Sequence, residues 1–571
     1  MSKIGKGVLE NLTQAMYDDS RIVYREYLQN SCDQIDVAKE KNSFPDEKLE
    51  VIITIDEKKR NIFIRDNANG ISVKEVEKRL GDVADSEKVQ GQNKGFRGIG
   101  RLGGIGYCNE LRFITSFRGE KVETTMIWNA KRLQEIFWDS KNHMSAEAIL
   151  DEIITYEAKE ADEDAHYFEV QMLGITEGND KLLDYKDIKQ YISEVAPVDF
   201  KKTFLFRSEI YNFVKNNEEV PPIHCYDIGI RRQDGELNYI SKEYPNAIYK
   251  MAGKEKKRVD DIKGVQTDII YDTKGNPIAW IWYAISSFKG AINDMGNPYK
   301  GLRLRQFNIQ IGDKTTLVKF FKETRGNSYF MGEIHTISPK LRPNARRDYF
   351  NETIEVRELE DALREYFKGL SKLYKAGSEI NSSYNNIDKA EKLQEKYNES
   401  LQTRFISPEN KNQMEAELAK AKEKAKEGLA TIKKYNTQAN KDKNSAVAKI
   451  VNAIKSDKNV DMDKVEEAFG SYKTIKETNT STETRNPTTT TNATKATQPS
   501  KEYTTTQPTE KKEKTKYLTE ELSCYDKKTR KIISRIYDVI YKNMIAEEAT
   551  DLVRKIHEEL KNNRWNVKYY L

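Results

Sequence analysis

Cysteine and histidine are both scarce in this chain of 571 residues. The four cysteines (Cys32, Cys108, Cys225 and Cys524) include no Cys-x-x-Cys pair, which argues against a zinc site and against a disulfide framework. The five histidines are scattered and indicate no metal cluster. The N-terminus lacks an apolar signal core, and no apolar run approaches membrane-spanning length. We therefore expect a cytoplasmic protein without a membrane segment.

An excess of charge of either sign is also missing. Lysine and arginine total 96 against 91 aspartates and glutamates, which gives a formal net charge of +5. This near-balance does not by itself indicate a nucleic-acid-binding protein. Charged residues nevertheless make up 33% of the chain and hydrophobic residues 37%, which is typical of a soluble protein. The length predicts roughly three to four domains.

One stretch is unusually rich in glycine. Residues 94–106 read KGFRGIGRLGGIG and contain six glycines. Because glycine loses more conformational freedom on folding than any other residue, so dense a run indicates a sharp turn or a close approach to the backbone. Backbone N–H groups beside Lys94, Arg97 and Arg101 suit an anion such as a phosphate chain. A glycine-rich hinge is the alternative, and this stretch alone does not decide between them.

A polar face is predicted on a helix near the N-terminus. Apolar residues recur at near-helical period from Gly7 to Leu28. Glu26, Asn30 and Asp33 are spaced i, i+4, i+7 and so share one face. An amide oxygen can ligate Mg²⁺, and a carboxylate one turn away can orient or deprotonate a water. An ordinary polar helix face is the simpler alternative.

A predicted hairpin follows, with strands at 49–56 and 61–65. It ends in Asp66-Asn67-Ala68-Asn69-Gly70. An acidic residue at a strand end, before a turn of small residues, can place a carboxylate where it accepts a hydrogen bond from an exocyclic amine such as that of adenine. A plain turn rich in Asp, Asn and Gly is the alternative.

The three motifs, in this order, resemble the GHKL ATPases. These include gyrase-type topoisomerases, the ninety-kilodalton heat-shock chaperones, histidine kinases and the MutL mismatch-repair proteins. The resemblance implies an α+β protein that begins with a Bergerat-type ATPase domain. There, a layer of helices covers a mixed, mostly antiparallel sheet, and ATP binds between the helices under a glycine-rich lid. No helix resembles the phospho-acceptor histidine helix of the kinases.

The resemblance implies a role for each matching residue. Glu26 resembles the general base that activates water, and Asn30 resembles the Mg²⁺ ligand. Asp33 resembles a neighbouring polar contact, and Asp66 resembles the carboxylate that reads the adenine amine. The other positions implied in nucleotide binding are Gly70, Lys94, Gly95, Gly98 and Gly100. The roles of Arg97 and Arg101 stay open, and so does that of the second half of the stretch, for which tight helix–sheet packing is one interpretation.

Two positions depart from the family pattern. Ala68 stands where the first glycine of D-x-G-x-G is usual, and alanine would not suit a positive φ. Phe168, on a predicted strand at 167–173, falls where a threonine that helps hold adenine is expected. The sequence therefore leaves the adenine contact expected at Phe168 in doubt.

A loop further along sharpens the resemblance. Residues 341–350 read LRPNARRDYF, similar to the L-x-N-x-S-R-E loop in the middle domain of the heat-shock chaperones. The arginine of that loop contacts the γ-phosphate, so Arg347 is the first candidate for a catalytic sensor and Arg346 the second. Arg303 and Arg305 are lower-ranked candidates for the same interface. A surface cluster of Arg and Asp is the alternative.

The expected organisation has five parts. An ATPase domain at 1–200 precedes an α/β, transducer-like middle domain at 201–375. An alanine-rich helical stripe predicts a coiled-coil region at 376–472. A low-complexity disordered linker is predicted at 473–515, and a small helical module at 516–571.

We expect a homodimeric clamp that binds ATP and Mg²⁺, hydrolyses the ATP to ADP and phosphate, and acts on protein clients as an HtpG-like chaperone does. Two alternatives stay open. One is a nucleic-acid clamp resembling the MORC or MutL proteins, and the other is an interaction protein in bacterial defence that uses ATP as a switch.

Overall fold

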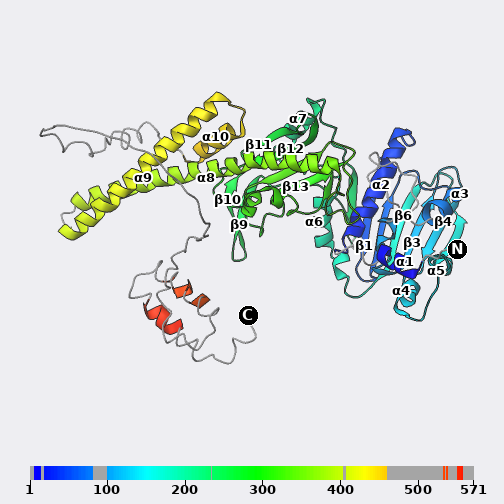
Figure 1. The fold of residues 1–571 in the computed structure, drawn as a ribbon. Helices are drawn as coiled ribbons and strands as arrows, with labels where there is room; N and C mark the ends of the chain where they lie inside the picture. The colour runs from blue at the N-terminus through cyan, green and yellow to red at the C-terminus, as the bar shows by residue number, and fades with distance from the viewer. Residues whose placement is uncertain are drawn as a thin grey trace, which may run out of the picture. The chain divides into compact units, whose positions relative to one another are not determined.

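A computed structural model describes residues 5–13, 19–81, 100–232, 235–402 and 407–458, together with 532–533, 535–537, 540 and 550–556. The chain divides into two compact units, Met1–Lys476 and Glu477–Leu571. The fold is α+β, as the sequence predicts, and Figure 1 traces it along the chain. The predicted linker at 473–515 lies outside the described residues.

An eight-stranded sheet dominates the N-terminal part, in the order β5-β4-β3-β6-β2-β1-β7-β8. Every neighbouring pair is antiparallel except β1 and β7, which are parallel. The strands are β1 (Glu50–Asp56), β2 (Asn61–Asp66), β3 (Cys108–Ser116), β4 (Val122–Trp128), β5 (Ile154–Glu160), β6 (Tyr167–Ile175), β7 (Asp227–Arg231) and β8 (Leu237–Tyr239).

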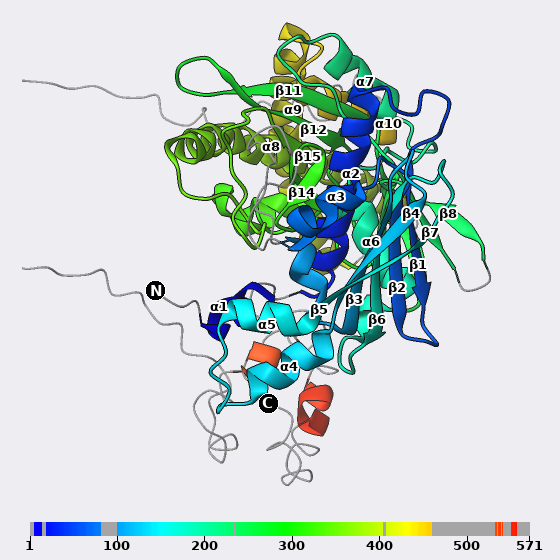
Figure 2. The same cartoon turned by 90° about the vertical axis from the view of Figure 1, so that its right-hand side faces the viewer.

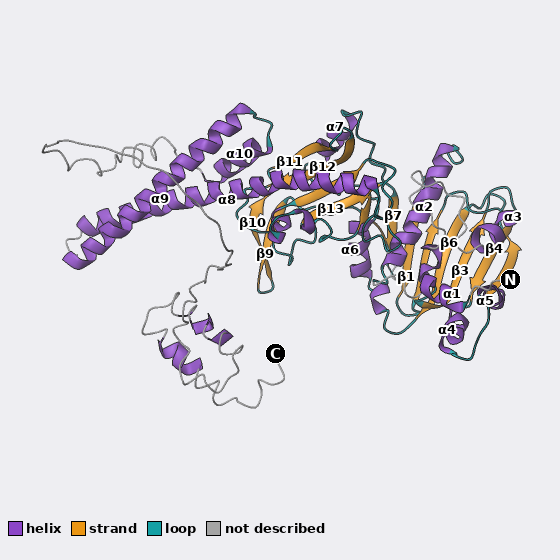
Figure 3. Ribbon diagram, viewed as in Figure 1, coloured by secondary structure: helices purple, strands orange, loops and turns teal. Residues whose placement is uncertain are grey.

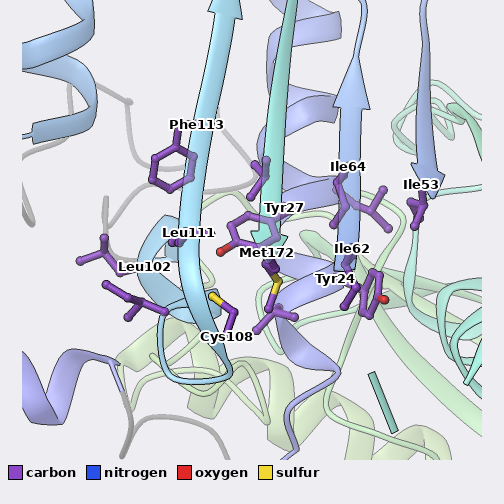
Figure 4. Packing of buried hydrophobic residues seen from close by; sticks show 14 of the residues in the cluster. Tyr24, Tyr27, Ile53, Ile62, Ile64, Leu102, Cys108, Leu111, Phe113 and Met172 are labelled. Atoms are coloured by element: carbon purple, nitrogen blue, oxygen red, sulfur yellow. The ribbon is translucent and has the colours of Figure 1, made fainter. Parts of the chain in front are cut away.

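Helices cover this sheet because their apolar residues gather on one side. The helices and turns of this part are α1 (Lys6–Thr13), α2 (Ile22–Glu40), α3 (Val73–Val76), η1 (Glu77–Gly81), η2 (Gly100–Gly104), α4 (Ala130–Trp138), α5 (Ala146–Ile153), η3 (Asp180–Leu182) and α6 (Tyr185–Val195). Figure 4 shows Tyr27 of α2 beside Met172 of β6, and Tyr24 beside Ile62 of β2. Helices α1, α4 and α5 pack together, separately from α2 (Figure 2).

The first sheet extends beyond residue 200, the boundary expected from the sequence. The chain leaves the first core after Val198 and contributes Phe200, Phe204 and α7 (Arg207–Lys215) to a second core around Trp282. It then returns to the first sheet as β7 and β8. The two parts are therefore interleaved along the chain.

The second part contains a five-stranded sheet in the order β11-β12-β15-β13-β14 and a separate β9–β10 hairpin (Figure 3). Its strands are β9 (Ala247–Ala252), β10 (Glu255–Asp261), β11 (Gly264–Tyr271), β12 (Pro277–Ile285), β13 (Gly301–Gln306), β14 (Ile309–Ile311) and β15 (Met331–Thr336). Two 3₁₀ turns, η4 (Val318–Phe320) and η5 (Thr324–Tyr329), connect β14 to β15.

Three helices follow: α8 (Ile354–Gln402), α9 (Pro408–Lys441) and α10 (Ala446–Lys458). The first turns of α8 share a core with the second sheet, and the alanine-rich stripe of α9 packs along the later turns of α8 (Figure 1). Pro408 begins α9, where the Ser407 hydroxyl accepts a hydrogen bond from the Asn410 N–H at 3.3 Å.

In the second unit, the described residues Ile533 and Tyr537 are buried against Ile540, Val553 and Ile556. Within the described part of the chain, no helix is both long and apolar enough to cross a membrane.

Candidate active site

Helix α2 carries the three polar residues that the sequence places on one face. Glu26 is 6% exposed and Asp33 is 2% exposed, while Asn30 between them is half-buried. An ordinary polar helix face leaves such side chains in water, because carboxylates are seldom buried without a partner. The burial of this face therefore singles it out from a solvated helix surface.

The second half of the glycine-rich stretch packs against α2. A Cβ at Gly100 would lie 2.4 Å from Glu26 Oε2, and a Cβ at Gly104 would lie 2.4 Å from the Tyr27 hydroxyl. That hydroxyl accepts a hydrogen bond from the Gly104 N–H at 2.9 Å and donates one to the Arg101 carbonyl at 3.0 Å. Gly104 thus permits tight packing on α2, and Gly100 brings the backbone against Glu26.

The first half of that stretch, with Lys94, Gly95, Arg97 and Gly98, lies outside the described residues. Arg101 is described, and its Nη1 donates to the carbonyl of Arg79 at 2.9 Å. This contact ties η2 to η1, the turn that follows the Asp66 motif.

Asp66 ends β2 and is 1% exposed. Its Oδ1 accepts a hydrogen bond from the Ala68 N–H at 3.2 Å, whereas its Oδ2 is buried without a hydrogen-bond partner. Burial raises the pKa of Asp66 to about 6, against the opposing effects of the Ser31 hydroxyl and the Ala68 N–H. A buried oxygen without a partner is unfavourable, so it is a natural acceptor for an incoming donor. The Asp66 carboxylate therefore fits the exocyclic amine of adenine.

Gly70 occupies a place that no other residue fits. Its φ is 68°, and a Cβ there would lie 2.1 Å from the Ser116 carbonyl oxygen and 2.9 Å from that of Tyr167. Ala68, by contrast, is fully buried but does not adopt a positive φ. The conformational objection to alanine at this position therefore does not arise.

Phe168 on β6 pairs in register with Asp66 on β2 and with Thr115 on β3. Thr115, which belongs to no sequence motif described above, is 1% exposed. Its hydroxyl accepts from the Ile71 N–H at 2.7 Å and donates to the Tyr167 carbonyl at 3.1 Å. Thr115 therefore connects the turn after Asp66 to β6. This role becomes visible only once the pairing register of β3 with β6 is known.

The loop after β15 brings Arg347 to α2. Arg347 Nε lies 2.5 Å from Glu26 Oε1, as an ion pair that is not aligned as a hydrogen bond. Nearby, Arg25 Nη2 donates to the Arg346 carbonyl at 3.3 Å. Arg346 itself is exposed, whereas the side chain of Arg347 is 11% exposed. The structure thus brings together Glu26 and Arg347, the two residues for which the resemblance implies catalytic roles.

The backbone of Arg347 is in the left-handed region, with a φ of 55°. This conformation is uncommon for a residue other than glycine and costs on the order of 1–3 kcal/mol. Its surroundings hold it there, because the Gly312 N–H donates to the Arg347 carbonyl at 2.8 Å and the Arg347 N–H donates to the Asn344 carbonyl at 3.1 Å.

Arg303 and Arg305, the lower-ranked candidates, lie elsewhere. Both are buried on β13, where Arg305 pairs with Glu333 at 2.5 Å and Arg303 pairs with Glu194 of α6 at 3.3 Å. The Glu333 carboxylate also contacts Lys242 at 2.9 Å. This buried cluster connects the second sheet to α6, through Glu194, and to the segment after β8, through Lys242.

Residues 22–166 match the family model described as histidine kinase-, DNA gyrase B-, and HSP90-like ATPase. Over this range, the N-terminal domain matches that ATPase family. The matched range of the ATPase domain contains Glu26, Asn30, Asp66, Gly70 and Gly100, and it ends before β6. The loop that carries Arg347 lies outside it.

The chain is also similar to the chaperone protein HtpG of Wigglesworthia glossinidia brevipalpis, with 33% identity over 87 residues. That similarity covers 14% of this chain and 14% of the HtpG chain. The relation therefore concerns a short part of both proteins.

Proposed function

We propose that this protein binds Mg-ATP in its N-terminal ATPase domain and hydrolyses it to ADP and phosphate. The observation that carries the proposal is the contact of Arg347 with Glu26, beside the glycine turn at Gly100. A general base, a phosphate-facing backbone and a mobile cation are the groups that phosphoryl transfer to water requires.

Each residue has a distinct task in this proposal. The Oδ2 of Asp66 accepts the adenine amine, and Gly70 lets the turn after Asp66 approach β6. Asn30 would hold Mg²⁺, which supplies neutralising charge at the phosphate oxygens when bound. Glu26 orients the attacking water and takes its proton.

Arg347 links hydrolysis to the second part of the chain. In the structure its guanidinium faces Glu26, so the candidate base and the candidate sensor form an ion pair with each other. We infer that Arg347 exchanges the Glu26 carboxylate for a phosphate oxygen when nucleotide binds. The exchange frees Glu26 to accept a proton and places positive charge where negative charge develops.

At the level of the whole protein, we propose a homodimeric, chaperone-like clamp that closes with ATP and reopens on hydrolysis. The partial similarity to HtpG and the Arg347 loop support this assignment. ATP binding and dimerisation would then strengthen each other to the same extent. Cross-linking of dimers with and without ATP tests this proposal. A cross-linking yield that does not change with nucleotide would contradict the clamp.

A nucleic-acid clamp is the second candidate. The observation that favours it is the projecting α9, where residues 420–434 hold six lysines and two glutamates. Duplex DNA that stimulates ATP turnover, with an affinity that falls steeply with salt, would support this candidate. Suppression of client aggregation without a response to DNA would instead support the chaperone.

A further inference from the structure

His166 lies immediately before β6, beside the turn that follows Asp66. The catalytic roles proposed above do not use it. Its side chain is 8% exposed. Nδ1 lies 3.1 Å from the Ala68 carbonyl oxygen, and Nε2 lies 2.9 Å from Glu47 Oε2. The ring stacks on Phe44, with centroids 3.8 Å apart and planes 9° apart. Three separate contacts therefore fix the orientation of the imidazole.

Both ring nitrogens face atoms that only accept hydrogen bonds. A carbonyl oxygen and an ionised carboxylate have no proton to give, so a hydrogen bond to either one needs an N–H on the ring, and the tautomer determines which nitrogen carries it. Glu47 is also 3.6 Å from Arg118, which in turn is 3.7 Å from Asp164. In the tautomer with its proton on Nδ1, the imidazole donates to the Ala68 carbonyl, in the turn that follows Asp66.

Ala68 connects His166 to Asp66. Its N–H donates to Asp66 Oδ1 at 3.2 Å, and its carbonyl accepts from His166. Its neighbour Asn67 is held on the other side, where its Oδ1 accepts from the Glu50 N–H at 2.7 Å. The methyl side chain of Ala68 offers no polar anchor, and among the described residues it is the His166 ring that contacts the Ala68 carbonyl.

We propose that His166 is a positioning residue for adenine recognition, acting through the peptide of Ala68 on the carboxylate of Asp66. The proposal rests on the ATP-binding function proposed above. When the donor at Nδ1 is present, the turn presents the unpartnered Oδ2 of Asp66 in a fixed direction. Without this donor the turn is more mobile. Nucleotide binding must then order the turn, and the entropy cost weakens the affinity for nucleotide.

Two substitutions distinguish the contribution of Nδ1 from that of Nε2. His166→Asn places an amide donor close to where Nδ1 lies, whereas His166→Gln reaches toward the place of Nε2 and leaves the Ala68 carbonyl without a donor. Both remove the ring that stacks on Phe44, so the loss of packing is common to the pair. The difference between the two variants therefore isolates the donor at Ala68.

The test measures the equilibrium affinity of the full chain for Mg-ADP, with nucleotide-free melting temperature and turnover at saturating ATP as further readouts. We expect His166→Gln to weaken ADP binding about tenfold and His166→Asn to weaken it less than about threefold. Turnover at saturating ATP should stay within about twofold of wild type in both variants, because Glu26 and Arg347 are untouched.

Each outcome decides something. Equal ADP affinities in the two variants would overturn the role of His166 while leaving the proposed ATPase function intact. A fall in saturated turnover that matches the fall in affinity would also overturn it, because the residue would then act on the catalytic step. A wild-type chain that binds no ADP would overturn the proposed function, and this role with it.

Discussion

The carboxylate of Glu26 and the guanidinium of Arg347 touch, with Oε1 2.5 Å from Nε, and the two side chains are only 7% and 11% exposed. Because the contact is largely buried, salt screens it little. One ion pair therefore holds both the candidate base and the candidate sensor. Any group that draws Arg347 away also changes the environment of Glu26, and this is a physical basis for coupling nucleotide to the second part of the chain.

Glu26→Gln tests the base. We expect phosphate release to fall at least about a hundredfold, because an amide does not accept the proton of the attacking water. ADP and ATP should still bind, since the adenine and phosphate contacts remain. Glu40→Gln, at the exposed end of the same helix, is the matched control and should leave turnover unchanged. Normal hydrolysis by Glu26→Gln would remove Glu26 from the reaction.

Arg347→Ala tests the sensor. Turnover should fall on the order of a thousandfold, while nucleotide affinity changes little, because the arginine acts on charge that develops during transfer. Single-turnover kinetics with a parallel binding measurement separates the two effects. Arg342→Ala, an exposed arginine in the same loop, should behave as wild type. If Arg346→Ala proves the more damaging variant, the assignment moves to that neighbour.

Asp66 predicts a pH dependence of stability. Burial raises its pKa from 3.8 to about 6, so the folded state binds this proton more tightly than the unfolded state. The resulting stabilisation is complete below about pH 4 and is lost as the pH rises through about 6. The shift corresponds to roughly 3 kcal/mol.

Asp66→Asn carries no such proton. Its free energy of unfolding should therefore rise relative to wild type by roughly 2 kcal/mol between pH 4 and pH 7. Urea denaturation of both proteins across this range measures the difference, and contributions from all other groups cancel. A difference that stays constant with pH would contradict the raised pKa of this buried carboxyl.

Gly70→Ala tests the close approach at the adenine turn. We expect it to destabilise the nucleotide-free protein more than Gly119→Ala does. Both glycines have a positive φ, but a Cβ at Gly119 meets nothing within 4 Å, whereas one at Gly70 would lie 2.1 Å from the Ser116 carbonyl oxygen. Gly119→Ala should cost about 1–2 kcal/mol for its φ alone. Equal losses in thermal denaturation would contradict the close contact at Gly70.

The local elements were predictable because local periodicity determines them. The spacing of Glu26, Asn30 and Asp33 gives a shared helix face in any helix, and alternation predicts β1 and β2 as a hairpin. The alanine-rich helical stripe predicted within 376–472 corresponds to the buried face of α9, which includes Leu429.

Long-range relationships were not predictable from local pattern. The resemblance implied that Arg347 contacts the γ-phosphate, but it did not predict the contact with Glu26, and the left-handed φ of Arg347 has no signature in the sequence. The parallel pairing of β1 with β7 depends on a return of the chain from another core. His166 resembled a scattered histidine, because the carbonyl and carboxylate that it contacts come from distant segments.

The parallel pairing of β1 with β7 also determines how the ATPase domain can be studied apart from the rest. A fragment that ends at residue 200 lacks β7, so β1 becomes an open edge whose alternate residues, Val51, Ile53 and Ile55, are hydrophobic. Such an edge pairs readily with other chains. A fragment that ends at residue 166 also lacks β6, the strand between β3 and β2. A soluble ATPase fragment therefore has to run past Tyr239, and insolubility of a shorter one would reflect a missing strand rather than a failure to recognise nucleotide.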